Sequence, residues 1–186
     1  MKPKLDILKT VQAIAVLLRT TDRTRLEYLS LLKMLYLADR ESLAETGTTI
    51  TDDAVVAMEN GPVLSEIYDL IYLNHWDLAL WTSFLHRDEY DLELTGDPGV
   101  DHLSAYEIRK LEEIARRYER YSWRELVEET HRLPEWQWHR PDRSHGVRIR
   151  PIPFKDILKA VGREADAESI MQDREAIVAL EKALGR

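Results

Sequence analysis

Residues 55–70 read VVAMENGPVLSEIYDL, and they join an apolar segment to a helical pattern through Asn60, Gly61 and Pro62. Proline is favoured in the first turn of a helix, because its φ angle is already set and the N–H that it lacks has no partner within the helix. The apolar residues that follow are three or four apart, at Val63, Ile67, Leu70 and Ile71. We therefore predict a strand near Val55 to Met58 and a helix that begins at Pro62.

The turn itself has two interpretations. The N-terminus of a helix attracts anions, and Gly61 would allow a bound anion to approach the backbone. Loops that hold phosphate use several glycines for this purpose, however, and this loop contains only Gly61. A tight connection between strand and helix is the favoured interpretation, and a ligand-binding loop is the alternative.

Two helices are predicted before this turn. The apolar positions of the first are three or four residues apart, at Leu8, Val11, Ile14, Ala15 and Leu18. Thr24 and Glu27 have the spacing of a capping box, in which two side chains satisfy backbone N–H groups at the start of a helix. We predict that the second helix begins at Thr24 and buries Leu26, Leu29, Leu32 and Tyr36.

Beyond the turn, the hydrophobic pattern changes from helical to alternating. From Tyr90 to Leu94, apolar residues alternate with acidic residues, which is typical of a half-buried strand. The segment Thr82 to His86 is its predicted hairpin partner, and Val55 to Met58 is the predicted third strand. The sequence thus predicts one small antiparallel sheet.

Two helices in the second half are predicted from their capping boxes. Ser104 with Glu107 marks the start of one, and Ser122 with Glu125 marks the start of the other. With the helices above, they define the predicted fold class. It is a mainly α protein, a single compact helical domain with a small antiparallel β-sheet.

The last two predicted helices lie near the C-terminus. Pro153 begins the first, and Gly162 ends it. The second runs from about Asp166 to Leu184. Its apolar stripe consists of Ile170, Ile177, Leu180 and Leu184.

The composition limits the class of protein. A chain of 186 residues, 44% of them hydrophobic, buries one sizeable core. It has no apolar run of about 18 residues and no leader pattern at its start, so we expect a cytoplasmic protein without a membrane partner. The absence of cysteine excludes disulfides, thiol catalysis and cysteine-ligated metals. A formal charge of -8 makes nucleic acid an unfavoured partner and favours a basic protein.

Residue types that can catalyse are present without a catalytic motif. They are Ser65 with Glu66, Ser122 with His131, and Asp52 with Asp53. None lies in a nucleophile elbow or a paired-carboxylate motif, so we predict that the protein is not an enzyme and holds no cofactor. His131, His139 and His145 lack the regular helical spacing of zinc ligands, and no metal is predicted either.

Nucleic-acid binding remains an alternative on two grounds. The two capped helices meet at a break near Tyr121, as in a helix-turn-helix unit, but the second helix has three glutamates against Arg124. A second basic segment follows it. Arg140, Arg143, Arg148 and Arg150 lie close in sequence to Trp136 and Trp138, a combination found in single-strand binding surfaces.

Two surfaces are candidates for binding a protein partner. From Asp88 to Asp101 the chain has six acidic residues and no Lys or Arg, beginning with Asp88, Glu89 and Asp91. The second surface is aromatic. Its residues are Tyr72, Trp76, Trp81, Trp136 and Trp138. We favour an apolar anchor with an acidic rim, in which only tryptophans exposed in the free protein qualify as anchors.

An ordered set of short motifs resembles one known family. The first half contains KMLYLADR at residues 33–40, Gly47 with Ile50 and Thr51, AMENGPV at 57–63 and SEIYDL at 65–70. The second half contains Leu103 with Ser104, SWREL at 122–126, Thr130 and His131 with PEW at 134–136, and Pro151 with Ile152. Together they resemble the Panacea domain, the SocA-like antitoxin family, over residues 5–162. The motif residues are Lys33, Tyr36, Asp39, Asn60, Gly61, Pro62, Tyr68, Thr130, His131 and Trp136.

The resemblance implies an antitoxin that binds and neutralises a cognate protein toxin. A relative acts as an adaptor that delivers its toxin to a protease, so a protease is a second implied partner. The family commonly has His-Gly-Pro where this chain has Asn60, Gly61 and Pro62. The implied domain covers residues 1–162, and residues 163–186 form a C-terminal helical extension. A transcriptional or RNA-binding regulator is the alternative function.

Overall fold

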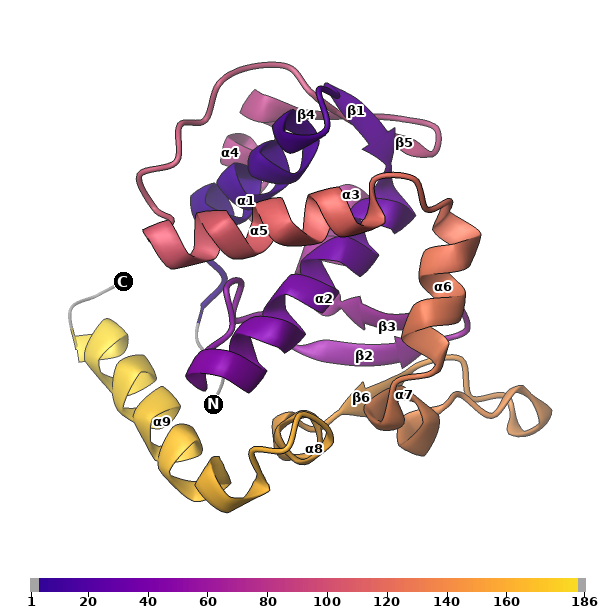
Figure 1. Ribbon diagram of the computed structural model, residues 1–186, viewed down its shortest axis with the longest axis vertical. Coiled ribbons are helices and arrows are strands. Elements are labelled where there is room, and N and C mark those ends of the chain that lie inside the picture. The colour runs from indigo at the N-terminus through magenta and orange to yellow at the C-terminus, as the bar shows by residue number, and fades with distance from the viewer. Residues whose placement is uncertain (1–3, 184–186) are drawn as a thin grey trace.

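Three helices pack against one another at the centre of the fold (Figure 1). They are α1 (Ile7–Thr20), α2 (Tyr28–Thr46) and α5 (Ala105–Tyr118). The computed structural model describes residues 4–183, apart from the side chains of Arg143, Glu181 and Lys182. In α1 every residue from Val11 to Leu18 is buried, which is typical of a helix with neighbours on all sides. The predicted first helix is confirmed.

The first sheet has the strand order β1-β5-β4 and is antiparallel. Its strands are β1 (Arg25–Glu27), β4 (Leu85–Asp88) and β5 (Asp91–Leu94). The predicted strand at Tyr90 to Leu94 is confirmed, except that Tyr90 lies in the preceding turn. The predicted strand at Thr82 to His86 is wrong in its first half, because residues 82–84 belong to helix α4 (Ala79–Phe84). There the hydroxyls of Thr82 and Ser83 donate to carbonyls one turn earlier in the chain.

The start of α2 also differs from its prediction. Thr24 and Glu27 form no capping box, and α2 begins at Tyr28. Residues 25–27 pair instead with β5, and the Leu94 N–H donates to the Thr24 carbonyl. The backbone groups that a helix would use are therefore taken by the sheet. Leu26 consequently lies in β1 rather than on the helix.

The second sheet has the strand order β3-β2-β6 and is also antiparallel. Its strands are β2 (Val55–Met58), β3 (Gly61–Leu64) and β6 (Arg150–Ile152). Pro62 is paired with Ala57 in β3, so the prediction that it begins a helix is wrong. Proline is tolerated here because β3 is an edge strand.

Helix α3 (Ser65–Ile71) begins after β3 because a distant carboxylate caps it. The Asp53 side chain accepts hydrogen bonds from the N–H groups of Glu66 at 3.1 Å and Ile67 at 2.9 Å. These two donors have no partner within the helix. The predicted helical positions Ile67, Leu70 and Ile71 are buried as expected.

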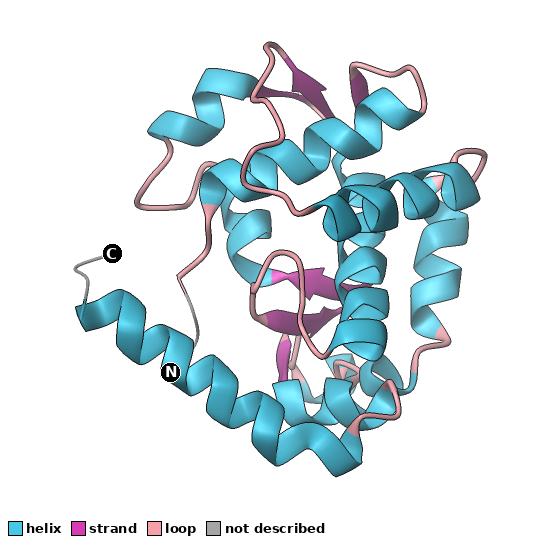
Figure 2. Cartoon of the chain, turned by 60° about the vertical axis from the view of Figure 1, so that its left-hand side comes forward, coloured by secondary structure: helices cyan, strands magenta, loops and turns pink. Residues whose placement is uncertain are grey.

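The two sheets lie apart in the fold (Figure 2). The prediction of one sheet that contains Val55 to Met58 is therefore wrong, because β2 pairs only with β3 and β6 among the described residues. Helix α2 follows β1 directly and packs on β3. Its 19 residues, at about 1.5 Å each, separate the two sheets. The fold class itself, mainly helical with minor antiparallel sheet in a single compact unit, is confirmed.

Both predicted capping boxes of the second half are confirmed. Ser104 and Glu107 cap α5, and Ser122 and Glu125 cap α6 (Trp123–His131). Helix α7 (Pro134–His139) follows α6 after two residues and turns back toward the hairpin of β2 and β3. A 3-10 turn (Arg143–His145) then lies between α7 and β6.

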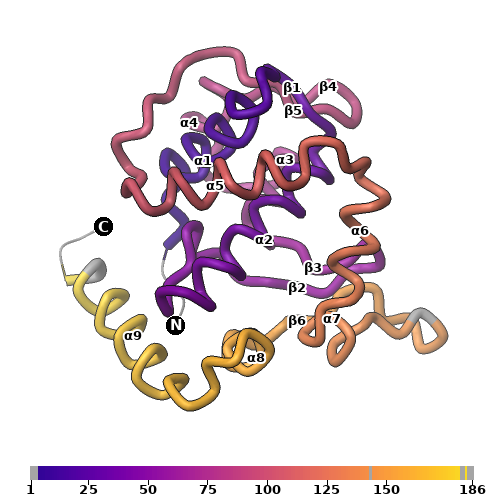
Figure 3. The backbone as a smooth tube through the Cα atoms, in the orientation of Figure 1, coloured from indigo at the N-terminus to yellow at the C-terminus, as the bar shows by residue number. Residues whose placement is uncertain are grey.

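The C-terminal part consists of α8 (Phe154–Ala160), a 3-10 turn (Glu164–Asp166) and α9 (Ala167–Ala183). The last helix is confirmed, and Leu184 of its predicted stripe lies outside the described residues. Arg163 donates to the carbonyls of Ala44 and Glu45 at the end of α2, and Arg174 pairs with Asp52 at 2.8 Å. Arg174 lies in the first half of α9, and the second half of this helix extends away from the rest of the fold (Figure 3).

Candidate partner-binding site

The hairpin of β2 and β3 approaches α2 and α6 closely at Gly61. The φ angle of Gly61 is +97°, in the left-handed region that favours glycine. A Cβ atom there would lie 2.7 Å from Thr130 Oγ1 and 3.0 Å from Lys33 Nζ. Glycine is therefore required at this position for both conformational and steric reasons.

Lys33 joins α2 to the same hairpin. Its side chain is fully buried, and its Nζ donates to the Pro62 carbonyl at 2.7 Å. Burial lowers the pKa of Lys33 to about 7, because the charged ammonium loses its hydration. The contact holds the backbone of the hairpin at Pro62 against α2.

A buried carboxylate connects α2 to α7. Glu135 Oε1 accepts hydrogen bonds from the Tyr36 hydroxyl and from Arg40 Nε, each at 2.7 Å. Burial, and then the charge of Glu135, raise the pKa of Tyr36 well above its ordinary value. The arginine offsets the glutamate charge, as a buried carboxylate requires. Glu135 is thus part of the motif cluster, although sequence reasoning gave it no role.

Asp39 holds the segment between α2 and β2. Its carboxylate accepts hydrogen bonds from the backbone N–H groups of Ile50 and Thr51 and from the Thr51 hydroxyl. Burial raises the pKa of Asp39 to about 7, and these hydrogen bonds oppose the rise. The motif aspartate is therefore a structural residue that orders the loop after α2.

His131 and Trp136 form one wall beside the hairpin turn. Their rings stack with centroids 3.9 Å apart and an angle of 12° between planes. Trp136 Nε1 donates to the Met58 carbonyl, and His131 Nε2 lies 3.0 Å from the Glu59 carbonyl. Since a carbonyl only accepts, His131 carries a proton on Nε2, and burial lowers its pKa. The two rings thus fix the turn from outside.

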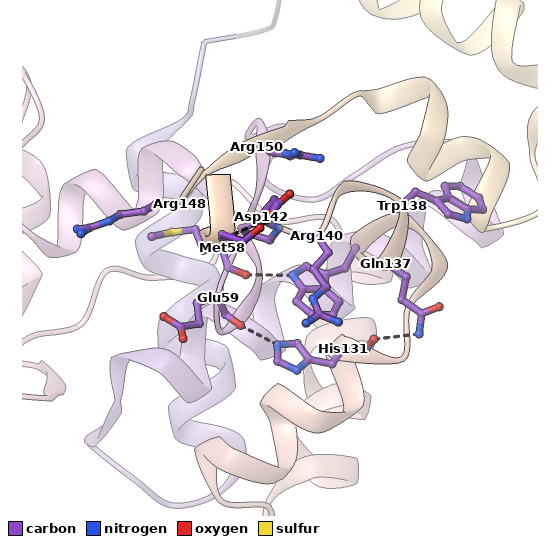
Figure 4. A pocket seen from close by; sticks show the side chains of 12 residues that line it. Met58, Glu59, His131, Gln137, Trp138, Arg140, Asp142, Arg148 and Arg150 are labelled. Atoms are coloured by element: carbon purple, nitrogen blue, oxygen red, sulfur yellow. Dashed lines mark hydrogen bonds between the residues drawn. The ribbon is translucent and has the colours of Figure 1, made fainter. Parts of the chain in front are cut away.

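A wide groove opens next to this wall (Figure 4). Its volume is about 1360 Å³. It lies between the hairpin turn, α7 and the segment that leads to β6. Its lining residues are Met58, Glu59, His131, Trp136, Gln137, Trp138, Arg140, Pro141, Asp142, Ser144, Arg148 and Arg150. The groove is open enough and polar enough to receive a segment of another molecule.

The structure brings most of the motif residues together. Eight of them surround the hairpin of β2 and β3 or anchor the segment before it: Lys33, Tyr36, Asp39, Gly61, Pro62, Thr130, His131 and Trp136. Asn60 is exposed in the hairpin turn. Tyr68 lies on α3 against Tyr72, with ring centroids 4.6 Å apart. Arg40 was visible within the motif at residues 33–40, but its contact with Glu135 across 95 positions was not.

The aromatic candidates divide into core and surface residues. Trp81 is 1% exposed and Trp136 is 7% exposed, so neither meets the condition of exposure set for an anchor. Both fill the hydrophobic core. Trp76 at 74% and Trp138 at 49% are exposed, and their role in partner binding remains a prediction.

The acidic run is partly neutralised by distant arginines. Arg25 donates to Asp91 at 2.6 Å, and Arg19 pairs with Asp97 at 2.9 Å. Asp88 and Glu89 are exposed at the turn between β4 and β5. These two residues are the most accessible acidic candidates, and their binding role also remains a prediction.

The histidines of the second half lie apart from one another within residues 4–183. No three His, Asp or Glu side chains gather there as metal ligands do. His139 pairs with Asp156, and His145 pairs with Asp142, at separate points of the chain. None of the described helices has the length and hydropathy needed to cross a membrane.

The fold and this cluster define a mainly helical domain in which a set of buried contacts fixes a β-hairpin beside an open groove. Residues 31–137 match the family model described as antitoxin SocA-like, Panacea domain. The match covers more than half of the chain, which therefore belongs to this family. No curated protein and no solved structure matches the chain.

Proposed function

We propose that the protein is an antitoxin that neutralises a cognate protein toxin by direct, stoichiometric binding. Family membership is the observation that supports this proposal, because the family is that of SocA-like antitoxins. The toxin is the partner in this proposal. The action is non-enzymatic.

The position of the motif residues supports binding over catalysis. Lys33, Tyr36 and Asp39 are buried, and each is hydrogen-bonded within the chain. A catalytic group must reach its substrate, so side chains in this position serve the shape of the domain rather than a reaction. The buried motif residues therefore maintain the shape of the domain surface, and the residues that contact the toxin are not among them.

Two exposed tryptophans are the proposed anchors for the toxin. Trp138 borders the groove, and Trp76 follows α3 in a segment that also exposes Tyr72 and Leu73. Leu73 has a φ angle of +54°, which is uncommon for a residue with a Cβ atom. Exposed apolar side chains held in an unfavourable backbone conformation are typical of interfaces, since folding alone does not favour them.

The test is capture of the toxin by the tagged protein. The product of the neighbouring open reading frame should co-purify in an equimolar complex, and co-expression should restore growth to cells that produce it. Replacing an anchor, in Trp76→Ala or Trp138→Ala, should cost about 2 kcal/mol or more of binding free energy. Tyr121→Ala is the control, because Tyr121 is an exposed aromatic residue outside both the acidic run and the aromatic surface.

The dependence of toxin binding on ionic strength distinguishes the tryptophan anchors from the acidic rim. Raising ionic strength should slow association and leave most of the affinity, because exposed charges such as Asp88 and Glu89 mainly set the association rate. Binding that vanishes at moderate salt and survives both tryptophan substitutions would make the acidic run the main contact. Absence of any captured protein, together with no effect on growth, would refute the antitoxin proposal.

A further inference from the structure

The charge of this acidic protein is unevenly distributed along the chain. Between residues 140 and 163 there are five arginines and two lysines against two aspartates, although the whole chain carries -8. The acid-rich residues 88–101 lie in and after the hairpin of β4 and β5. Figure 1 shows that hairpin at the opposite end of the molecule from α7 and β6. The fold therefore carries its acid-rich segment at one end and residues 140–163 at the other end, which is called the basic pole below.

The groove at the basic pole contains three arginines that have no ionic partner among the described residues. No described carboxylate lies within 4.0 Å of the guanidinium groups of Arg140, Arg148 or Arg150. The two acidic residues of the groove lining, Glu59 and Asp142, each interact with another group. Asp142 holds Ser144 and His145, and Glu59 also has a partner of its own. The three arginines thus present unneutralised positive charge at the groove (Figure 4).

Most of the other described arginines bind a carboxylate, although Arg23, Arg87, Arg109, Arg120 and Arg124 do not. Arg25, Arg40 and Arg117 each bind a carboxylate, and Arg163 and Arg174 do so as well. An arginine with five donors in a planar fork matches a carboxylate or phosphate group. Three such donors beside one groove indicate a binding site for an anionic group.

The rest of the groove limits what the anion can be attached to. The carbonyls of Met58 and Glu59 already accept from Trp136 and His131, so the hairpin turn offers few free acceptors. The Met58 side chain and Trp138 add apolar surface next to the arginines. An occupant with both carboxylates and an apolar side chain would satisfy these groups together.

We propose that the groove binds an acidic segment of a protein partner, with its carboxylates on Arg140, Arg148 and Arg150 and an apolar side chain against Trp138. The proposal rests on the proposed function in that the toxin is the partner that supplies the segment. It adds a second, basic contact to the acidic rim described above.

A single-stranded nucleic acid fits the groove less well. Such ligands stack successive bases on aromatic rings, but Trp136 is only 7% exposed and one of its faces is stacked on His131. That leaves Trp138 as the exposed tryptophan of the lining. A phosphate backbone that continued beyond the groove would also meet the glutamates of α6 and a chain of net charge -8.

The test measures binding of three fluorescein-labelled probes by anisotropy at low salt. The first is a peptide of alternating Glu and Leu residues, the second replaces each Glu by Gln, and the third is oligo-uridine. The acidic peptide should bind best. Its affinity should fall about tenfold or more in Arg140→Glu and in Arg148→Glu, the loss expected for a charged hydrogen bond.

Arg120→Glu is the matched control, because it changes the net charge equally at an exposed position between α5 and α6. It should leave peptide affinity within about twofold, since distant charges are screened. Circular dichroism and thermal unfolding verify that each variant is folded. Equal losses in all three variants, or no peptide binding, would overturn the proposal.

Two further outcomes are decisive. Tighter binding of oligo-uridine, lost in the same two variants, would replace the acidic segment by nucleic acid. Toxin capture without peptide binding would reject this inference and leave the antitoxin proposal standing. Peptide binding without any captured toxin would reject the antitoxin proposal and leave the acidic-segment site standing.

Discussion

Replacing Gly61 by alanine tests whether the hairpin is held as closely as the structure indicates. The new Cβ atom would lie 2.7 Å from Thr130 Oγ1, a distance that requires a neighbouring atom to move. Thr130 Oγ1 is not free to move, because it donates to the carbonyls of Leu126 and Val127 within α6. Gly61→Ala should therefore displace the hairpin from α6.

The magnitude follows from two contributions. Placing a residue with a Cβ atom at a left-handed φ angle lowers the free energy of unfolding by roughly 1–2 kcal/mol. Overpacking a filled interior typically costs about 1–3 kcal/mol more. Because a loss of about 1 kcal/mol of stability lowers the Tm of a chain of this size by roughly 2–4 °C, the Tm of Gly61→Ala should fall by about 4–20 °C.

The assay is thermal and urea unfolding followed by circular dichroism. Gly162→Ala is the matched control, because Gly162 has a φ angle of +79° and no atom within 4 Å of the added Cβ. The control isolates the backbone contribution, so the difference between the variants measures the contact with Thr130. If Gly61→Ala were no more destabilising than Gly162→Ala, the close approach of the hairpin would be refuted.

Three further predictions concern other parts of the chain. The pKa of Lys33 is about 7 in the folded state against 10.5 unfolded, so the unfolded chain binds more protons between these values and stability due to this group rises with pH. Urea unfolding at several pH values should show this rise, up to about 1.4 kcal/mol per pH unit, in the wild type and not in Lys33→Met; parallel pH profiles would contradict it. Leu73→Gly should raise the free energy of unfolding by about 0.5–1 kcal/mol by relieving the left-handed backbone, and should weaken toxin binding; lower stability would count against strain at Leu73. Truncation after Gly162 should leave a cooperatively unfolding domain with a Tm a few degrees lower, and a broad, non-cooperative transition in calorimetry would show that residues 163–186 are part of the core.

Local sequence signals predicted the elements that depend on neighbouring residues. The capping boxes at Ser104 and Ser122 join residues three positions apart, so the chain needs no distant partner to form them. The same holds for the apolar periodicity of α1 and for the alternation in β5. The ordered motifs also indicated the family before any contact between them was known.

Predictions failed where a distant segment competes for the same backbone groups. Thr24 and Glu27 have the spacing of a cap, yet pairing with β5 takes that segment into a sheet. Pro62 has the preference of a helix start, yet pairing with β2 and the hydrogen bond from Lys33 hold it in a strand. Local preferences amount to about 1 kcal/mol, and such long-range contacts exceed them.

The sequence by itself determined the helical class, most helix positions and the identity of the motif residues. Only the tertiary structure decided what those residues do. Burial separates Trp81 and Trp136 from Trp76 and Trp138, although all four have the same side chain. The groove exists only because β6 pairs with β2 across about half the chain, which brings the arginine segment to the hairpin. Burial and groove geometry depend on contacts between residues far apart in sequence, and periodicity within a segment carries no information about them.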